Sequence, residues 1–390
     1  MLGAGVAFTA GMRFIRRTLW ALLAAVLVFH IGGGWYFADQ FRNDALDVRH
    51  KPLERDLTVV AVSADGRSIT LKDPAPPSLE VRSQGDFALA WPKGFGRVSG
   101  AARIDGNLVT RDWTPESGTP TTGLKVAVNQ DDLAGDQPPG QPVSYSSPLG
   151  SMTARLQPGV GTTWAVLVHG KGAHPSEMAR MARVTAGDRL PTLIINYRND
   201  EGLPEDPTGH YRYGVTEWRD LKGALDFARG KGAQKYILGG NSMGGGIVAS
   251  YLKNTHDPDV IGAVLDAPML DLEATVEWGA AHRTLPGTSI ALPDTLTWTA
   301  EQIASARFDD VSWSATDYLS DTSWVAQPVL IVHGTKDLTV PLSTSQALAK
   351  AEPRRVHLVE FPGAGHCQSW NFDPSAYEAA ISTFLTRVTG

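Results

Sequence analysis

A glycine-rich turn around one serine constrains the fold of this 390-residue chain more than any other feature. The segment 239–246, GGNSMGGG, directly follows the short apolar run 236–238. A serine at the tip of a sharp strand-to-helix turn has a strained backbone and leaves no room for side chains two residues away. Gly240 and Gly244 occupy those two places in the pattern G-x-S-x-G. Because the pattern alone is weak, it predicts a nucleophilic Ser242 only if a strand precedes it and a helix follows.

Strand and helix patterns alternate from about residue 143 to the C-terminus. The continuous apolar run 164–168 predicts a strand buried on both faces, and 143–147 with 152–156 predict an antiparallel pair. Further strands are expected at 192–196, 235–238, 260–265, 329–332 and 356–361, and helices at 175–186, 215–229, 245–252 and 375–388. This alternation predicts an α/β fold with a mostly parallel central sheet flanked by helices. The interval 273–325 breaks the alternation, and we interpret it as a cap or lid over the active site.

Two loops after later strands carry the residue types that a serine nucleophile needs. His366 follows a Gly-Ala-Gly segment, where its imidazole could reach the serine as a general base. Asp337 follows the strand 329–332, and a carboxylate there could orient the histidine. Asp266 and Asp271, after the preceding strand, are the competing acids. We favour Asp337 because its loop leads into a predicted helix.

Acyl transfer also requires main-chain N–H groups that stabilise the developing oxyanion. Met243, the residue after the serine, and Lys171, in the loop His-Gly-Lys-Gly at 169–172, are the candidate donors. His169 is expected to shape that loop. No spacing of the ten histidines suits a metal, so neither a metal nor a cofactor is predicted. The single cysteine, Cys367, excludes an intramolecular disulfide, and we interpret it as a small buried residue rather than a nucleophile.

Residues 143–390 resemble the α/β-hydrolase superfamily, in particular its serine hydrolases of the esterase and prolyl-oligopeptidase-related kind. The resemblance rests on the oxyanion loop, the serine turn, the acid loop and the histidine loop in the expected order. It implies Ser242 as nucleophile, His366 as base and Asp337 as its acid partner, with Met243 and Lys171 in the oxyanion hole.

The implied activity is that of a carboxylesterase-like serine hydrolase, which cleaves an ester or related acyl bond of a small-molecule or lipid-like substrate through an acyl-enzyme. The oxyanion loop lacks the three-glycine form of some lipases, and Asn241 replaces the Glu or His that often precedes the serine. Alternatives are an aminopeptidase-like peptidase, in which Glu177 or Glu217 holds the substrate amine, an acyltransferase, and a non-catalytic membrane-anchored binding protein.

The N-terminal region carries a second signal, an uncharged stretch of 21 residues at 18–38. As a helix it is long enough for a bilayer core of about 30 Å. Because Arg13, Arg16 and Arg17 precede it, we expect residues 1–17 inside and the catalytic domain outside the membrane. A cleaved signal peptide, giving a secreted protein, and a buried core helix are the alternatives.

The net charge of −6 argues against a nucleic-acid partner.

Residues 39–142 predict a small β-rich region and linker before the domain at 143–390. Segments 57–62 and 68–71 flank an Asp-Gly pair and predict a hairpin, and 87–91 and 106–109 predict further short strands.

Overall fold

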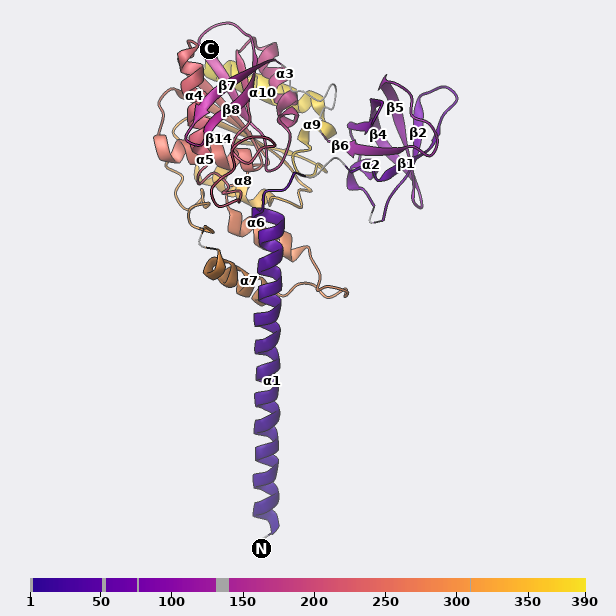
Figure 1. Ribbon diagram of the computed structural model, residues 1–390, viewed down its shortest axis with the longest axis vertical. Helices are drawn as coiled ribbons and strands as arrows, with labels where there is room; N and C mark the ends of the chain where they lie inside the picture. Colours follow the sequence, from indigo (N-terminus) through magenta and orange to yellow (C-terminus); the bar gives the residue numbers. More distant parts are fainter. Residues whose placement is uncertain (1–2, 51–53, 76, 131–139, 309) are drawn as a thin grey trace. The chain divides into compact units, whose positions relative to one another are not determined.

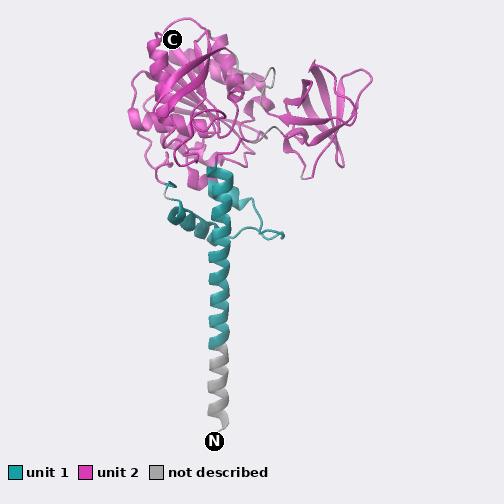
Figure 2. Ribbon diagram, in the orientation of Figure 1, with its two compact units in different colours: residues 1–47, 276–312 teal, residues 48–275, 313–390 magenta. Residues whose placement is uncertain are grey.

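A computed structural model describes residues 3–50, 54–75, 77–130, 140–308 and 310–390, with side chains from Arg16 onward. The chain forms two compact units, coloured separately in Figure 2. One unit combines residues 1–47 with 276–312, and the other combines 48–275 with 313–390. The side chain of Arg13, part of the predicted basic flank, lies outside the described residues.

The larger unit contains an eight-stranded sheet with the order β14-β13-β12-β11-β9-β10-β8-β7 (Figure 1). Six strands run parallel, and the antiparallel hairpin of β7 and β8 forms one edge. The bounds are β7 Gln141–Ser147, β8 Gly150–Gln157, β9 Thr163–Val168, β10 Thr192–Ile195, β11 Lys235–Asn241, β12 Val260–Asp266, β13 Val329–Gly334 and β14 Val356–Phe361. This sheet confirms the predicted α/β fold, including the antiparallel pair at its start.

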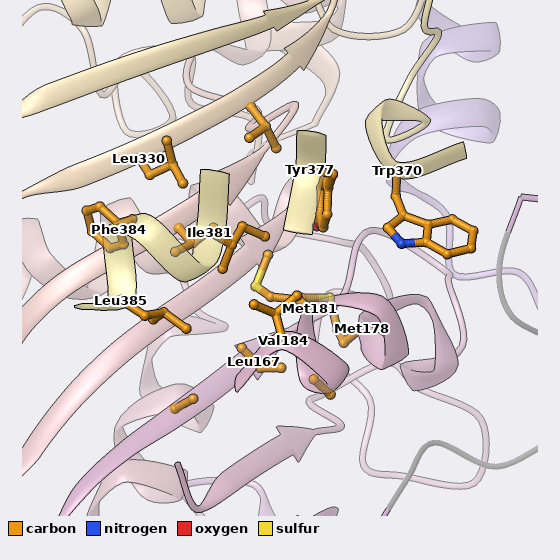
Figure 3. Packing of buried hydrophobic residues seen from close by; sticks show 14 of the residues in the cluster. Leu167, Met178, Met181, Val184, Leu330, Trp370, Tyr377, Ile381, Phe384 and Leu385 are labelled. Carbon is orange, nitrogen blue, oxygen red and sulfur yellow. The ribbon is translucent and has the colours of Figure 1, made fainter. Parts of the chain in front are cut away.

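Helices flank this sheet, and a tightly packed apolar layer joins two of them to it. Side chains of α3 and α10 meet Leu167 and Leu330 of the sheet, as Figure 3 shows for Met181, Ile381 and Phe384. The helices of this unit are η2 Pro175–Met178, α3 Ala179–Gly187, α4 Trp218–Gly230, α5 Met243–Thr255, α8 Leu342–Ala351, α9 Ser369–Phe372 and α10 Pro374–Thr389. Because β9 is apolar and buried along its length, it occupies the sheet centre that its sequence predicted.

Residues 57–129 form a closed six-stranded barrel with the order β1-β2-β5-β4-β3-β6. Its bounds are β1 Leu57–Val62, β2 Ser68–Lys72, the short helix α2 Leu79–Arg82, β3 Phe87–Trp91, β4 Gly94–Asp105, β5 Leu108–Ser117 and β6 Lys125–Asn129. The predicted hairpin is present, with Gly66 at φ 69° in its turn. The segment 106–109 was expected to be a strand from its first residue, but Gly106 has φ 60° in a turn and the strand begins at Leu108.

The smaller unit contains the long helix α1, Gly3–Phe41, a π-helical turn at Arg42–Leu46, and the helix α7, Asp294–Arg307. The helix α6, Leu272–Ala281, links the two units in sequence. Residues Arg16–Leu46 are long and apolar enough to cross a membrane by length and composition alone. The placement of the interval 273–325 over the active site stays a prediction.

Candidate active site

The turn around Ser242 has the strained geometry that its sequence predicted. Ser242 adopts φ 51° and ψ −118° between β11 and α5, and its N–H donates to the Asp266 carbonyl at 2.9 Å. A Cβ atom at Gly244 would lie 2.2 Å from the Val168 carbonyl oxygen, and one at Gly240 would lie 2.5 Å from the Gly244 oxygen. Glycine is therefore required at both positions by direct collision, and the serine side chain is held at the carboxyl end of the sheet.

Three side chains predicted from separate loops meet at this turn. His366 Nε2 lies 2.9 Å from Ser242 Oγ, and His366 Nδ1 lies 2.7 Å from Asp337 Oδ2. A histidine that donates from Nδ1 to the carboxylate can accept the serine proton at Nε2. Burial alone would lower the pKa of His366, but the hydrogen bond and charge of Asp337 outweigh it and raise that pKa.

A second histidine, His333, also contacts the acid, and the sequence analysis assigned it no role. Its Nε2 lies 3.2 Å from Asp337 Oδ2, while its Nδ1 lies 2.8 Å from Ser345 Oγ. Asp337 Oδ1 accepts main-chain N–H groups of Thr339 and Val340 at 2.8 and 2.9 Å. Burial would raise the pKa of Asp337, but hydrogen bonds from both histidines and the backbone hold it below its usual range. No local sequence pattern predicts this contact, because it depends on tertiary packing.

The loop after β9 is fixed by buried polar contacts. His169 Nε2 lies 2.9 Å from Asp200 Oδ2, and its ring stacks on Tyr197 with centroids 4.6 Å apart. The Gly170 N–H donates to Glu177 Oε2 at 2.6 Å, and a Cβ at Gly170 would lie 3.3 Å from the Ser242 Cβ. The loop therefore lies against the serine turn, with His169 in the structural position expected for it.

The two predicted oxyanion donors occupy the elements expected for them. Met243 is the first residue of α5, a position whose N–H has no acceptor within a helix. Lys171 follows Gly170, whose own N–H is already used by Glu177. The Lys171 ammonium lies 5.9 Å from the Tyr211 ring centroid, so its side chain extends along that ring.

The competing acids lie in different environments. Asp271 accepts the Ala274 N–H at 3.0 Å and so caps the start of α6. Asp266 ends β12 and is buried near the candidate triad, and its Oδ1 has no hydrogen-bond partner in the described part of the chain. Burial raises the pKa of Asp266 to about 7.

Cys367 and Glu217 are both buried close to segments of the candidate site. Cys367 Sγ lies 3.8 Å from His366 Nε2, farther than the serine oxygen, and 3.7 Å from the Asp266 carbonyl oxygen. Glu217 accepts main-chain N–H groups of Arg212 and Gly214 at 2.7 and 2.9 Å.

Within the described residues, no group of three or more His, Cys, Asp and Glu side chains could hold a metal ion.

The short helix α9 begins three residues after His366 and joins the histidine loop to the barrel. Asn371 Oδ1 accepts from Arg180 at 2.8 Å, and its Nδ2 donates to the Gln130 carbonyl at 3.0 Å. The Asp86 N–H donates to the Asn371 carbonyl at 2.8 Å. No local pattern predicts this connection to the barrel, because it pairs residues more than 200 positions apart.

Comparisons with known proteins assign the class of this fold. The family model of the alpha/beta hydrolase family matches residues 165–380, and the chain therefore belongs to that family. The human protein ABHD12B is 25% identical over 227 residues, which cover 52% of this chain and 55% of ABHD12B. The chain thus matches about half the length of this curated relative.

Solved structures agree on the fold. The esterase Pf2001 of Pyrococcus furiosus superposes with a TM-score of 0.51 at 16% identity, over 64% of this chain and 93% of that protein. In a second crystal form of Pf2001 the TM-score is again 0.51, at 15% identity. At this level of identity the likeness concerns the fold alone.

Proposed function

We propose that this protein is a serine hydrolase that cleaves a carboxylic ester or related acyl bond. The observation that carries the proposal is the continuous hydrogen-bonded path from Ser242 Oγ through His366 to Asp337. In this role His366 takes the serine proton as Oγ attacks the acyl carbon, and Asp337 stabilises the resulting imidazolium. The main-chain N–H groups of Met243 and Lys171 would stabilise the oxyanion. The imidazolium then gives this proton to the alcohol that leaves as the ester C–O bond breaks, and water hydrolyses the acyl-enzyme with the neutral His366 as its base.

Two observations favour an ester over the amine-terminated substrate of an aminopeptidase. The Glu177 carboxylate is occupied by the Gly170 N–H, and Glu217 is buried and occupied by main-chain N–H groups of its own loop. Neither acid is placed to receive a substrate ammonium in preference to these donors. The intact path at Ser242 likewise favours an enzyme over a non-catalytic binding protein.

We also propose that α1 anchors the protein, with its N-terminus inside and the hydrolase domain outside the membrane. Apolar side chains of α1 are exposed along the span, among them Leu19, Leu23 and Leu27. Arg16 and Arg17 stand before the span and are exposed. Positive residues on the cytoplasmic flank favour this orientation.

The test of the chemistry is labelling of the full-length protein with a fluorophosphonate probe. Wild type should be labelled and should hydrolyse p-nitrophenyl esters, and Ser242→Ala should lose both activities. Ser151→Ala, a change of an exposed serine on β8, is the matched control and should behave as wild type. Labelling that persists in Ser242→Ala would exclude this nucleophile. Faster turnover of aminoacyl-nitroanilides than of esters would favour the peptidase alternative.

A further inference from the structure

The helix α7 packs closely against the outer third of α1, within the smaller unit (Figure 1). A Cβ atom at Gly33 would lie 2.9 Å from Leu296, and one at Gly34 would lie 2.8 Å from Thr299. The glycines of the apolar stretch therefore have a packing role, since only small residues allow α7 to approach this closely.

Polar contacts extend the same interface at both ends. His30 Nε2 lies 3.0 Å from Thr295 Oγ1, near the start of α7. At the other end Arg307 pairs with Asp39 at 2.8 Å, and its guanidinium lies 3.9 Å from the Trp35 ring centroid. The two helices thus run side by side from His30 to Asp39.

The rise of a helix places this interface at a definite depth. From Arg17 to Asp39, the charged residues that bracket the apolar stretch, α1 extends about 33 Å, close to the thickness of a bilayer core. His30 lies about 13 Å below Asp39 along the helix axis. If α1 spans the membrane, the start of α7 lies at the depth of the outer leaflet.

The segment 284–300, which leads into and includes the first half of α7, has the composition expected for that depth. Ile290 and Trp298 are 60% and 62% exposed, and Ile31 and Trp35 on α1 are 52% and 51% exposed. Tryptophan favours the boundary between headgroups and acyl chains. Asp294 is the one exposed charge between residues 284 and 300, and it stands in the first turn of α7, where the helix dipole favours an acid.

Basic residues on either side of this segment mark its upper limit. Arg307 pairs with Asp39 and Arg283 lies 3.4 Å from Asp44, so both guanidinium groups are level with the first charged residues beyond the apolar stretch. Basic side chains at this level suit the lipid headgroups.

We propose that the segment 284–300 is a second membrane-contacting element, which lies in the outer leaflet beside α1. Its partner is the lipid bilayer rather than a second copy of the chain, because the segment packs on α1 within the apolar stretch that is proposed to span the membrane. The proposal rests on the membrane span proposed above. The proposal implies that residues 30–39 are retained, since cleavage near Ala38 would remove the surface against which α7 packs.

The test places a fluorophore at single introduced cysteines in the full-length protein, reconstituted in phosphatidylcholine vesicles. Ile290→Cys and Trp298→Cys report on the segment 284–300, Leu23→Cys reports on the span, and Ser151→Cys is the exposed control on the hydrolase domain. Native Cys367 is buried and stays in place. Each variant is compared with wild type by thermal unfolding, which establishes that it is folded.

We expect blue-shifted emission and a loss of intensity with lipids brominated along their acyl chains for positions 290 and 298. Position 23 should also respond to these lipids, and position 151 should not. Quenching at 23 with none at 290 and 298 would overturn the second element and leave the anchor in place. Absence of quenching at 23 would overturn the anchor and, with it, this inference. A response at 290 and 298 that vanishes when the protein is diluted in lipid would assign the surface to a second copy and overturn the proposal.

Discussion

Two buried aspartates near the same histidine, at the ends of the neighbouring strands β12 and β13, have pKa values that are shifted in opposite directions. Asp266 and Asp337 are both almost fully buried, at 2% and 3% exposure. Burial acts on both in the same direction, because it disfavours the charged carboxylate. Yet the pKa of Asp266 is raised to about 7, whereas that of Asp337 lies below its usual range.

Hydrogen bonding accounts for the difference. Asp337 receives two main-chain N–H groups from its own loop and contacts His333 and His366, so its charge is well compensated. Asp266 is part of a regular strand, whose main-chain groups pair with neighbouring strands, and one of its carboxylate oxygens has no partner among the described residues. The hydrogen bonds in the loop beyond a strand end, and not proximity to the histidine, therefore determine which acid is held ionised.

The largest effect expected from this comparison concerns catalysis. Asp337→Asn should lower kcat/KM for a p-nitrophenyl ester about 10⁴-fold, because the amide no longer holds the productive tautomer of His366. Asp266→Asn should keep most of the activity. Asp321→Asn, at an exposed turn, is the matched control. The measurement is initial rates on the full-length protein in detergent, and an equal loss in Asp266→Asn would break the comparison.

The second prediction concerns stability and has opposite signs for the two acids. The raised pKa of Asp266 means that the folded protein binds this proton more tightly than the unfolded chain. The associated stability is complete below the unfolded pKa and is lost as pH rises through about 7. The free energy of unfolding of Asp266→Asn should therefore increase relative to that of wild type as pH rises, by about 2–4 kcal/mol at most.

For Asp337 the lowered pKa stabilises the fold above the unfolded pKa, and this stability is lost only as pH falls through the folded value. Asp337→Asn should therefore be less stable than wild type at neutral pH. Urea unfolding of both variants in detergent, at about pH 5 and pH 8, measures the trend for Asp266→Asn, and it should show the same loss of stability for Asp337→Asn at both pH values. A variant of Asp266 that becomes relatively less stable at the higher pH would contradict the assignment.

A third prediction concerns His333, whose Nε2 lies 3.2 Å from the same Asp337 oxygen that His366 contacts. His333→Ala removes one hydrogen bond to a charged group, which corresponds to about 1.5–3 kcal/mol and a loss of activity of about 10- to 100-fold. Gln can place an amide near the former Nε2, so His333→Gln should recover part of the activity. Comparing kcat with KM in both variants separates positioning of the acid from substrate binding, because only kcat should respond. Equal activity in the Ala and Gln variants would speak against the hydrogen bond.

The sequence predicted the regular parts of this site and missed those set by distant contacts. Gly240 and Gly244 predict the serine turn because a side chain at either position would collide with the neighbouring backbone. Strand ends in a parallel sheet meet at one edge, so Asp337 and His366 could be placed near Ser242 by order alone. The contact between His333 and Asp337, and the role of Asn371 between the barrel and α9, depend on tertiary packing and have no local pattern. The same holds for the packing of α7 on α1. This packing explains why the apolar stretch contains Gly33 and Gly34.

The smallest expected effect, and the most specific, is a shift in the pH dependence. His366 must be neutral to accept the serine proton, and its raised pKa means that kcat/KM rises with pH through a midpoint above the usual 6.5. Besides burial and Asp337, the negative charge of Asp266 contributes to this raised pKa. Asp266→Asn removes that charge and destabilises the imidazolium, so the midpoint should move to lower pH while the plateau stays near that of wild type. Rates from about pH 5 to pH 9 measure the shift, with Asp321→Asn as the control. An unchanged midpoint would mean that Asp266 is neutral throughout this range and that its charge does not act on His366.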